Sequence, residues 1–311
     1  MSNIVGVDIG GTKTSVIIGD SSPKVFYKEK FETSDSLLTL KNVVEIIKSY
    51  KSQYGSIDSI GISCGGPLSS KDGIIICPPN LPKWKNVEIV KYFYEQLNIH
   101  SKLENDANAC AVAEYLWGAG RGSSNMAFFT FGTGLGAGLI LNGRLYRGTS
   151  DMAGEIGHIR LSDNGPIGYN KVGSFEGFCS GGGITKLCEI RLKEKSKDAI
   201  EFQNLLGNKK LTTYEIANIA KMGNKFAISI FEESALYLGK GISILIDILN
   251  LEKIIIGGIY TRMESYFRDG MMQIIKEEAL EYSANFCDIV PSYLGEEIGD
   301  YSALAIAMNK I

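Results

Sequence analysis

Two glycine-rich turns carry the residue types that could hold phosphate groups: Asp8-Ile9-Gly10-Gly11-Thr12-Lys13 and Phe131-Gly132-Thr133-Gly134. Backbone N–H groups in a glycine turn can approach phosphate oxygens closely, because no Cβ blocks them. Thr12 adds a hydroxyl and Lys13 a cation. Asp8 would repel phosphate directly, so we expect it to face Mg²⁺, which proteins usually hold with one or two carboxylates plus substrate phosphates. Two such turns predict a site for a nucleoside triphosphate, although either could also be a plain hairpin turn.

Two common nucleotide motifs do not fit the first turn. Gly6 and Gly11 have the spacing of a P-loop, but Thr12-Lys13 follows instead of Lys-Ser/Thr, and the next segment has a strand pattern rather than a helix pattern. No Gly-x-Gly-x-x-Gly sequence stands between a strand and a helix, which disfavours a dinucleotide fold.

A candidate catalytic base lies where a short strand meets a helix, at Asn105-Asp106. Asp106 could accept the proton of a substrate hydroxyl during phosphoryl transfer. Both residues are also favoured helix N-caps, and capping alone is the alternative interpretation. Sugar recognition needs paired donors and acceptors, and the chain offers several near the expected edges of a cleft, namely Asn80, Asn105, Asp106, Glu155, His158 and Glu176.

The elements that must position these residues form an α/β pattern. We expect strand–turn–strand units over 4–18 and 126–141, strands over 57–64, 101–104 and 253–256, and helices over 37–54, 87–97, 107–117, 226–238, 242–249 and 300–308. A shift of 122 residues superposes Gly10 on Gly132 and Val7 on Phe129. This pattern predicts two lobes that each open with a hairpin facing a common cleft, unless the two hairpins are alike by chance.

The domain boundary is expected near residue 118, where Gly118 can end a helix. Residues 1–118 would form the first α/β lobe and residues 119–297 a larger second lobe. The helix over 298–311 is expected to pack back on the first lobe.

Composition excludes several classes of protein. The 311 residues carry a net charge of −3, which gives no basic surface for nucleic acid or for an anionic membrane. The uncharged run 122–143 has glycine at every second residue from 132 to 138, which suits a turn between strands better than a bilayer helix. Six scattered cysteines without a Cys-x-x-Cys pair and a start without a basic region predict a cytoplasmic protein with free thiols.

Four motifs together resemble the ROK family (repressors, open reading frames and sugar kinases): Asp8-Ile-Gly-Gly-Thr-Lys13, Glu104-Asn-Asp-Ala-Asn108, Phe131-Gly-Thr-Gly-Leu-Gly-Ala-Gly138 and Gly154-Glu-Ile-Gly-His158. They occur in the order of the family, and the resemblance spans nearly the whole chain. It implies the two-lobed actin-like ATPase fold, which is ribonuclease H-like, with a central ligand cleft.

The resemblance also implies roles for particular residues. Asp106 matches the catalytic base. The positions that match the phosphate-facing loops and the adenosine loop are Asp8, Gly10, Gly11, Thr12, Lys13, Gly132, Thr133, Gly134, Gly257 and Gly258. The positions that match sugar contacts are Gly66, Asn80, Asn105, Asp106, Glu155, His158 and Glu176.

One departure concerns zinc. Many members of the family bind zinc through the His of Gly-His and three cysteines, whose positions here are Ile167, Tyr169 and Ser174. Cys179 is displaced and cannot replace three thiolates, and a structural zinc site normally needs four ligands. We therefore expect no zinc, with the segment between His158 and Glu176 ordered by packing of Ile167 and Tyr169.

These features predict an ATP- and Mg²⁺-dependent sugar kinase that makes a 6-phosphate. Glucose is the first expectation, because Glu155, His158 and Glu176 resemble the glucokinase set, and N-acetylmannosamine, N-acetylglucosamine, fructose and allose stay open. A repressor of the same family would need a helix-turn-helix domain before the first glycine turn, for which a turn starting at Ile4 leaves no room. A non-catalytic sugar-binding or regulatory protein is the remaining alternative. The resemblance further implies a homodimer.

Overall fold

The computed structural model describes residues 3–308, which form two compact units. The first unit takes the described residues of Met1–Ser124, Gly138–Ala153 and Tyr293–Ile311, and the second takes Asn125–Ala137 and Gly154–Ser292. The expected division at residue 118 therefore misses the segment 138–153, which returns to the first unit. For the same reason the second unit is not the larger one. Residues 309–311 of the expected last helix lie outside the described residues.

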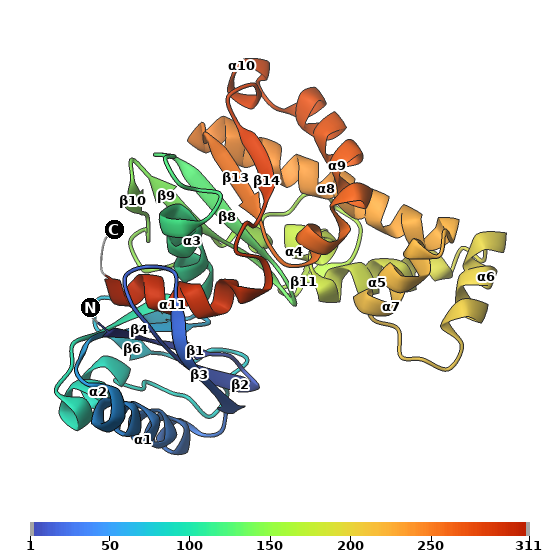
Figure 1. The fold of residues 1–311 in the computed structure, drawn as a ribbon. Coiled ribbons are helices and arrows are strands. Elements are labelled where there is room, and N and C mark those ends of the chain that lie inside the picture. Colours follow the sequence, from blue (N-terminus) through green and yellow to red (C-terminus); the bar gives the residue numbers. More distant parts are fainter. Residues whose placement is uncertain (1–2, 309–311) are drawn as a thin grey trace. The chain divides into compact units, whose positions relative to one another are not determined.

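The first unit contains a five-stranded sheet in the order β3-β2-β1-β4-β7 (Figure 1). Its strands are β1 (Asn3–Ile9), β2 (Lys13–Gly19), β3 (Val25–Glu32), β4 (Ile57–Cys64) and β7 (Ser101–Asn105). β1, β4 and β7 run parallel, whereas β2 and β3 are antiparallel to their neighbours. Ile9 pairs with Thr14 across the turn at Gly10-Gly11, which confirms the first predicted hairpin.

Side chains of β1 alternate between two buried faces of this sheet, as the period of a strand requires. Val5, Val7 and Ile9 join the core beneath α1, whereas Ile4 packs with Leu304 of α11. The helices of this unit are α1 (Ser36–Tyr54), α2 (Ile89–Leu97), α3 (Asp106–Trp117) and α11 (Ile298–Met308), and its short elements are β5 (Leu68–Ser69), β6 (Ile74–Ile75), β10 (Arg144–Leu145) and η2 (Gly295–Glu297). The face of Ile4 is also the face of Asp8, which therefore lies on the α11 side.

The last helix of the fold, α11, lies directly on the first strands of the chain, beside β1, β4 and α3 (Figure 1). Small residues make this close approach possible. A Cβ on Gly6 would lie 2.9 Å from the Cβ of Ala303, and one on Gly61 would lie 2.1 Å from the carbonyl oxygen of Ala303. Gly6 and Gly61 are also partners in the β1–β4 register. Two glycines facing an alanine-rich helix thus explain how α11 packs against the sheet.

The other sheet has the order β10-β9-β8-β13-β14. Its longer strands are β8 (Met126–Phe131), β9 (Leu135–Leu141), β13 (Lys253–Ile256) and β14 (Asp288–Pro291). Of these strands, β8, β13 and β14 lie in the second unit, whereas β9 is divided after Ala137 and β10 lies in the first unit. The remaining elements of the second unit are η1 (Ile156–His158), β11 (Ile167–Gly168), β12 (Lys171–Val172), α4 (Phe175–Phe178), α5 (Gly181–Leu192), α6 (Lys197–Leu206), α7 (Thr213–Lys221), α8 (Lys225–Leu249), α9 (Ile259–Glu278) and α10 (Glu281–Ala284). Its aromatic core includes Phe131, Phe231 and Phe267, with ring centroids of Phe131 and Phe267 5.4 Å apart.

One helix is longer than the sequence predicted. The expected helices over 226–238 and 242–249 are one continuous helix, α8, which runs through Gly239 and Gly241. Both glycines serve close packing rather than a break. A Cβ on Gly239 would lie 2.7 Å from the carbonyl oxygen of Met271, and one on Gly241 would lie 2.2 Å from the ring of Phe175.

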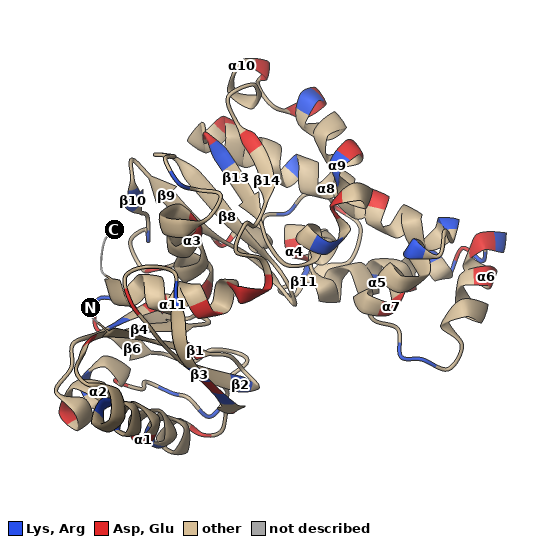
Figure 2. Ribbon diagram, in the orientation of Figure 1, with Lys and Arg blue, Asp and Glu red and all other residues tan. Residues whose placement is uncertain are grey.

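Charges of both signs are interspersed along the outer helices of the second unit, as α6 and α9 show in Figure 2. Within residues 3–308, no helix is both long enough and apolar enough to span a bilayer.

Candidate functional site

The carboxyl ends of β1, β4 and β7 bring several predicted site residues of the first unit to one edge of its sheet. Asp8 pairs in register with Ser63, and Ser63 pairs with Glu104; one residue further on, Cys64 pairs with Asn105. The ends of parallel strands are where α/β sheets commonly bind ligands. A register that spans nearly 100 residues of chain therefore gathers residues that the sequence alone could only present as separate motifs.

The first glycine turn is shaped by the side chain that lies against it. Gly10 N–H donates to the carbonyl oxygen of Lys13 at 3.0 Å, and the Thr33 hydroxyl donates to the carbonyl oxygen of Gly10 at 2.8 Å. A Cβ on Gly11 would lie 2.7 Å from the Cβ of Asn80. Gly11 therefore has to be glycine for Asn80 to lie beside the turn, and Thr12 on the same turn is exposed.

Both members of the Asn105-Asp106 pair accept a hydrogen bond at the start of α3. Asn105 is the N-cap of α3, and its Oδ1 accepts the Ala107 N–H at 3.0 Å. Asp106 is the first helical residue and accepts the same N–H through Oδ1 at 2.8 Å. Its second oxygen, Oδ2, lies 3.9 Å from the position of a Cβ on Gly65, and solvent reaches the side chain. Capping therefore occupies Asn105 and one oxygen of Asp106, and leaves the other oxygen available to a ligand.

The carboxyl groups of Asp8 and Asp106 are held in an environment that favours their neutral forms. Burial, followed by the charge of Asp106, raises the pKa of Asp8 to about 7, and the Ser63 hydroxyl and Lys30 oppose the shift only in part. Although solvent reaches Asp106, the surrounding protein restricts hydration of its carboxyl and raises its pKa. Perturbed carboxyl pairs of this kind are concentrated at functional sites.

The same environment fits a hard cation. Carboxylate oxygens are preferred ligands of Mg²⁺, which also keeps waters and substrate phosphates. A cation near Asp8 would offset the burial and the charge of Asp106 that together raise its pKa. Within residues 3–308, no three His, Cys, Asp or Glu side chains form a metal-binding group.

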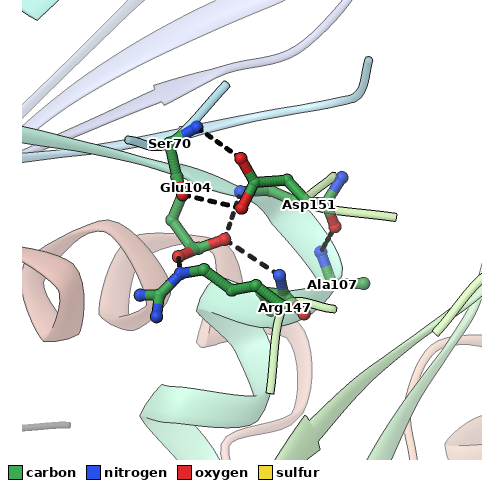
Figure 3. A network of polar contacts seen from close by, with 7 residues as sticks. Ser70, Glu104, Ala107, Arg147 and Asp151 are labelled. Carbon is green, nitrogen blue, oxygen red and sulfur yellow. Dashed lines mark hydrogen bonds and ion pairs between the residues drawn. The ribbon is translucent and has the colours of Figure 1, made fainter. Parts of the chain in front are cut away.

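Glu104 anchors the junction between β7 and α3 from beneath. Its side chain is 1% exposed, and it accepts the Asn105 N–H at 3.0 Å, the Asn108 amide at 2.9 Å and Arg147 Nε at 2.7 Å. Figure 3 shows Arg147 reaching this carboxylate. The peptide before Asp106 is thus fixed by a fully engaged buried carboxylate.

The segment that carries Arg147 has a second anchor. Asp151, with a φ of +59°, accepts the Ser70 N–H and the Ser70 hydroxyl, each at 2.8 Å (Figure 3). Sequence analysis missed Arg147, Asp151 and Ser70. The signal available for Arg147 was Glu104, a glutamate in the strand that leads into the candidate base, because a carboxylate buried in a strand requires a partner.

In the second unit, three glycine-rich segments meet at the carboxyl ends of β8 and β13. Gly181 N–H donates to the carbonyl oxygen of Gly132 at 2.8 Å. A Cβ on Gly258 would lie 2.2 Å from the carbonyl oxygen of Phe131, so the turn at Gly257-Gly258 also abuts the second glycine turn. The sequence predicted the turns at 132–134 and 257–258 but missed 181–183, which begin α5. Three adjacent glycines before a helix were the signal, because a helix N-terminus suits anions.

The predicted sugar contacts of this unit are only partly gathered. Glu176 Oε2 accepts the Leu135 N–H at 3.1 Å and would lie 2.8 Å from a Cβ on Gly134, so it lies against the second glycine turn. A Cβ on Gly157 would lie 3.2 Å from the Cβ of Glu176, which brings the segment of His158 alongside. Glu155 and His158 are both exposed.

The segment between His158 and Glu176 is not ordered in the way that we expected. Ile167 is 48% exposed and is not part of a buried core, whereas the ring of Tyr169 stacks on His158 with centroids 3.8 Å apart. The hydroxyl of Ser174 caps α4. Cys179 is buried, its thiol contacts the carbonyl oxygen of Ser234, and burial raises its pKa. This donor set does not fit zinc, because no thiolate is offered to His158.

Each unit therefore holds its own group of predicted residues. The first unit contains Asp8, Gly10, Gly11, Thr12, Lys13, Gly66, Asn80, Asn105 and Asp106. A Cβ on Gly66 would lie 3.4 Å from the Asn105 amide nitrogen, which places Gly66 in this group by geometry. The second unit contains Gly132, Thr133, Gly134, Glu155, His158, Glu176, Gly257 and Gly258.

Comparison with known proteins adds relatives of two kinds. The sequence profile of the ROK family matches residues 4–310. A glucokinase of Halalkalibacterium halodurans is 29% identical over 306 residues, which cover 95% of this chain and 92% of that protein. The xylose repressor of Bacillus subtilis is 26% identical over 315 residues, which cover 99% of this chain and 76% of the repressor.

A solved structure agrees over the same length. The ROK family glucokinase from Streptomyces griseus, in complex with glucose and AMPPNP, matches with a TM-score of 0.79 and 26% identity over 99% of both chains. The fold is accordingly the two-lobed actin-like ATPase fold, as the sequence predicted.

Proposed function

The chain belongs to the ROK family, and from this premise we propose that it transfers the γ-phosphoryl group of ATP to the 6-hydroxyl of a hexose. One observation carries the proposal: Asp8, Asn80, Asn105 and Asp106 converge at one edge of the first sheet. A sugar kinase needs a carboxylate for the attacking hydroxyl, amides for neighbouring hydroxyls and a carboxylate for the metal that accompanies the phosphates. This edge supplies all three.

Asp106 is the proposed general base. Its Oδ2 is the oxygen not used in capping α3, and it would accept the proton of the 6-hydroxyl as the oxygen attacks phosphorus. The raised pKa of this carboxyl favours the role, since a base accepts a proton more readily as its pKa approaches the working pH. Asn105 and Asn80 would hold adjacent sugar hydroxyls.

The glycine turns are the proposed phosphate contacts. In the first unit, these are the N–H groups of Gly10 and Gly11 and the hydroxyl of Thr12. In the second unit, they are the N–H groups of Gly132 and Gly134 and the hydroxyl of Thr133, with Gly257-Gly258 as the proposed adenosine contact. Asp8 would hold Mg²⁺, which when bound neutralises charge on the phosphates. Glu155, His158 and Glu176 are the proposed sugar contacts that the second unit contains.

The test is a coupled assay of ADP release with glucose, mannose, fructose, allose and the two N-acetylhexosamines. We expect turnover with at least one hexose, glucose first. In Asp106→Asn, turnover should fall by about 10²- to 10⁴-fold, while sugar binding measured by calorimetry persists. Normal turnover in this variant would remove Asp106 from the mechanism, and no turnover with any hexose would contradict the kinase proposal.

A regulatory protein is the second candidate, because the xylose repressor of Bacillus subtilis matches over 99% of this chain. Such a protein would bind a sugar without consuming ATP. Calorimetric sugar binding without ADP release would favour this candidate. The homodimer, the cytoplasmic location and the identity of the sugar stay predictions.

A further inference from the structure

Tyr169 occupies an unusual backbone position directly against His158. Its φ is +50°, and that of the next residue, Asn170, is +57°. A bulky aromatic residue rarely adopts this left-handed conformation, and residues that do so at a cost often serve a function. The ring of Tyr169 lies on the imidazole of His158 with centroids 3.8 Å apart and planes inclined by 23°. The strained turn thus delivers one specific aromatic contact.

The hairpin that carries Tyr169 is fastened at several points. β11 and β12 pair through Ile167 with Val172 and Gly168 with Lys171. The Ser174 hydroxyl donates to the carbonyl oxygen of Gly168 at 3.0 Å.

Two lysines fasten the backbone on either side of the stack. Lys186 Nζ donates to the carbonyl oxygen of Ile167 at 2.7 Å, and Lys171 Nζ donates to the carbonyl oxygen of His158 at 2.6 Å. Backbone and ring of His158 are therefore both held by the one hairpin.

This mode of holding His158 uses the face of the ring and neither of its nitrogens. Among residues 3–308, no side chain or backbone group forms a hydrogen bond or an ion pair with the imidazole nitrogens, and the residue is exposed. A metal ion would instead occupy one nitrogen. A neutral imidazole can donate from one nitrogen and accept at the other, which is the pattern needed by two neighbouring hydroxyl groups.

We propose that Tyr169 is a positioning residue, an aromatic clamp that orients His158 without metal so that both imidazole nitrogens face a polyhydroxy ligand. The ligand class rests on the proposed function, whereas the clamp itself does not. Aromatic pairs contribute about 0.5–1.5 kcal/mol beyond their buried area. Loss of the clamp should therefore weaken sugar binding by about 2- to 13-fold.

The chain has only two histidines, which makes NMR of the side chains a direct test. In the wild type, the ring protons of His158 should resonate upfield because they lie over the ring of Tyr169. Tyr169→Ala should abolish this shift, and Tyr169→Phe should retain it. His100 is a matched control, since it lies 5.5 Å from the ring of Tyr94, and Tyr94→Ala should move only the His100 signals.

Binding is measured separately. Titration with glucose, or with the best hexose from the panel, should perturb the imidazole nitrogen signals of His158. In Tyr169→Ala, the sugar Kd and KM should rise while the ATP KM stays unchanged, and Tyr169→Phe should restore both. One equivalent of Zn²⁺ added to chelator-treated protein should leave the His158 signals in place.

Three results would overturn the proposal: His158 signals unchanged in Tyr169→Ala, an unchanged sugar Kd in that variant, or specific displacement of the His158 signals by Zn²⁺. An inactive wild type would count against the kinase proposal alone, because the NMR comparison and the sugar Kd do not require turnover.

Discussion

The carboxylate of Glu104 and the guanidinium of Arg147 form an ion pair of 2.7 Å immediately beneath the peptide that leads into Asp106. Glu104 is 1% exposed, whereas Arg147 is 37% exposed. The carboxylate also accepts the Asn105 N–H and the Asn108 amide, so two of its three donors belong to the β7–α3 junction. This pair links the segment 138–153 to the proposed catalytic edge within a single unit.

Removal of Arg147 should leave a buried carboxylate with fewer donors. We expect Arg147→Ala to lower the free energy of unfolding by about 1–3 kcal/mol, because Glu104 keeps its two other donors and the arginine is partly exposed. Urea denaturation measures the change. The double variant Arg147→Ala with Glu104→Gln should lose less free energy of unfolding than the sum of the two single variants, since both substitutions remove the same interaction.

The control for this pair is Lys91, whose ion pair with Glu88 is exposed on both sides. Lys91→Ala should change stability by only about 0.5 kcal/mol or less. Equal losses in Arg147→Ala and Lys91→Ala would show that burial of Glu104 contributes nothing.

Stability should depend on pH through Asp8. Its pKa is about 7 in the folded protein against an ordinary value of 3.8, so the folded state binds a proton more tightly than the unfolded state. The stabilisation that comes from protonated Asp8 is complete below pH 3.8, declines as the pH rises between the two pKa values, and is lost above about pH 7. Asp8→Asn, which stays neutral, should be more stable than the wild type at about pH 8 and lose this advantage towards about pH 4.

The readout is thermal or urea unfolding of both proteins across that pH range. The same variant should lose the extra stabilisation that Mg²⁺-ATP gives the wild type, because Asp8 is the proposed ligand of the ion. A difference between the two proteins that does not vary with pH would contradict the assigned pKa.

Substitution of two glycines in the second unit distinguishes an effect on ATP binding from an effect on stability. A Cβ on Gly132 would meet nothing within 4 Å, so Gly132→Ala should change stability by only about 0.5 kcal/mol. The methyl group would nevertheless stand where a phosphate is proposed to lie, and the KM for ATP should rise about 10-fold or more. Steady-state kinetics and a melting curve check the two parts.

Gly258→Ala provides the contrast. Gly258 has a φ of +66°, and its Cβ would lie 2.2 Å from the carbonyl oxygen of Phe131. We expect a loss of about 1–3 kcal/mol in stability. An unchanged KM for ATP in a stable Gly132→Ala protein would argue against the phosphate role of that turn.

The contact between Asp151 and Ser70 should contribute more to the stability of the fold than the similar contact between Asp72 and Ser69. Asp151→Asn keeps a residue that tolerates positive φ. It replaces one of the two carboxylate oxygens that accept hydrogen bonds from Ser70 with an amide nitrogen. Thermal unfolding should show a loss of about 1–2 kcal/mol. Asp72→Asn, at the exposed contact with Ser69, should lower stability by about 0.5 kcal/mol or less. A larger loss in Asp72→Asn than in Asp151→Asn would count against the anchor.

The sequence was sufficient to predict structure that depends on neighbouring residues. The hairpin around Gly10-Gly11 and the cap at Asn105 follow from residues within a few positions of one another. The order of the four motifs was enough to identify the family, because such motifs are read along the chain. Which oxygens of Asn105 and Asp106 cap α3, by contrast, needed coordinates that assign each oxygen its partner.

Tertiary structure decided what depends on distant partners. Arg147 reaches Glu104 across 43 residues of sequence, and Gly181 reaches Gly132 across a similar interval. The sequence predicted two helices over 226–238 and 242–249, but the folded chain forms the single helix α8, in which Gly239 packs against Met271 and Gly241 against Phe175. The sequence by itself determined the motifs and their local shapes, since these depend on short-range sterics and hydrogen bonds. Only the folded chain determined which side chains share one environment, because burial and charge, as at Asp8 beside Asp106, act through space.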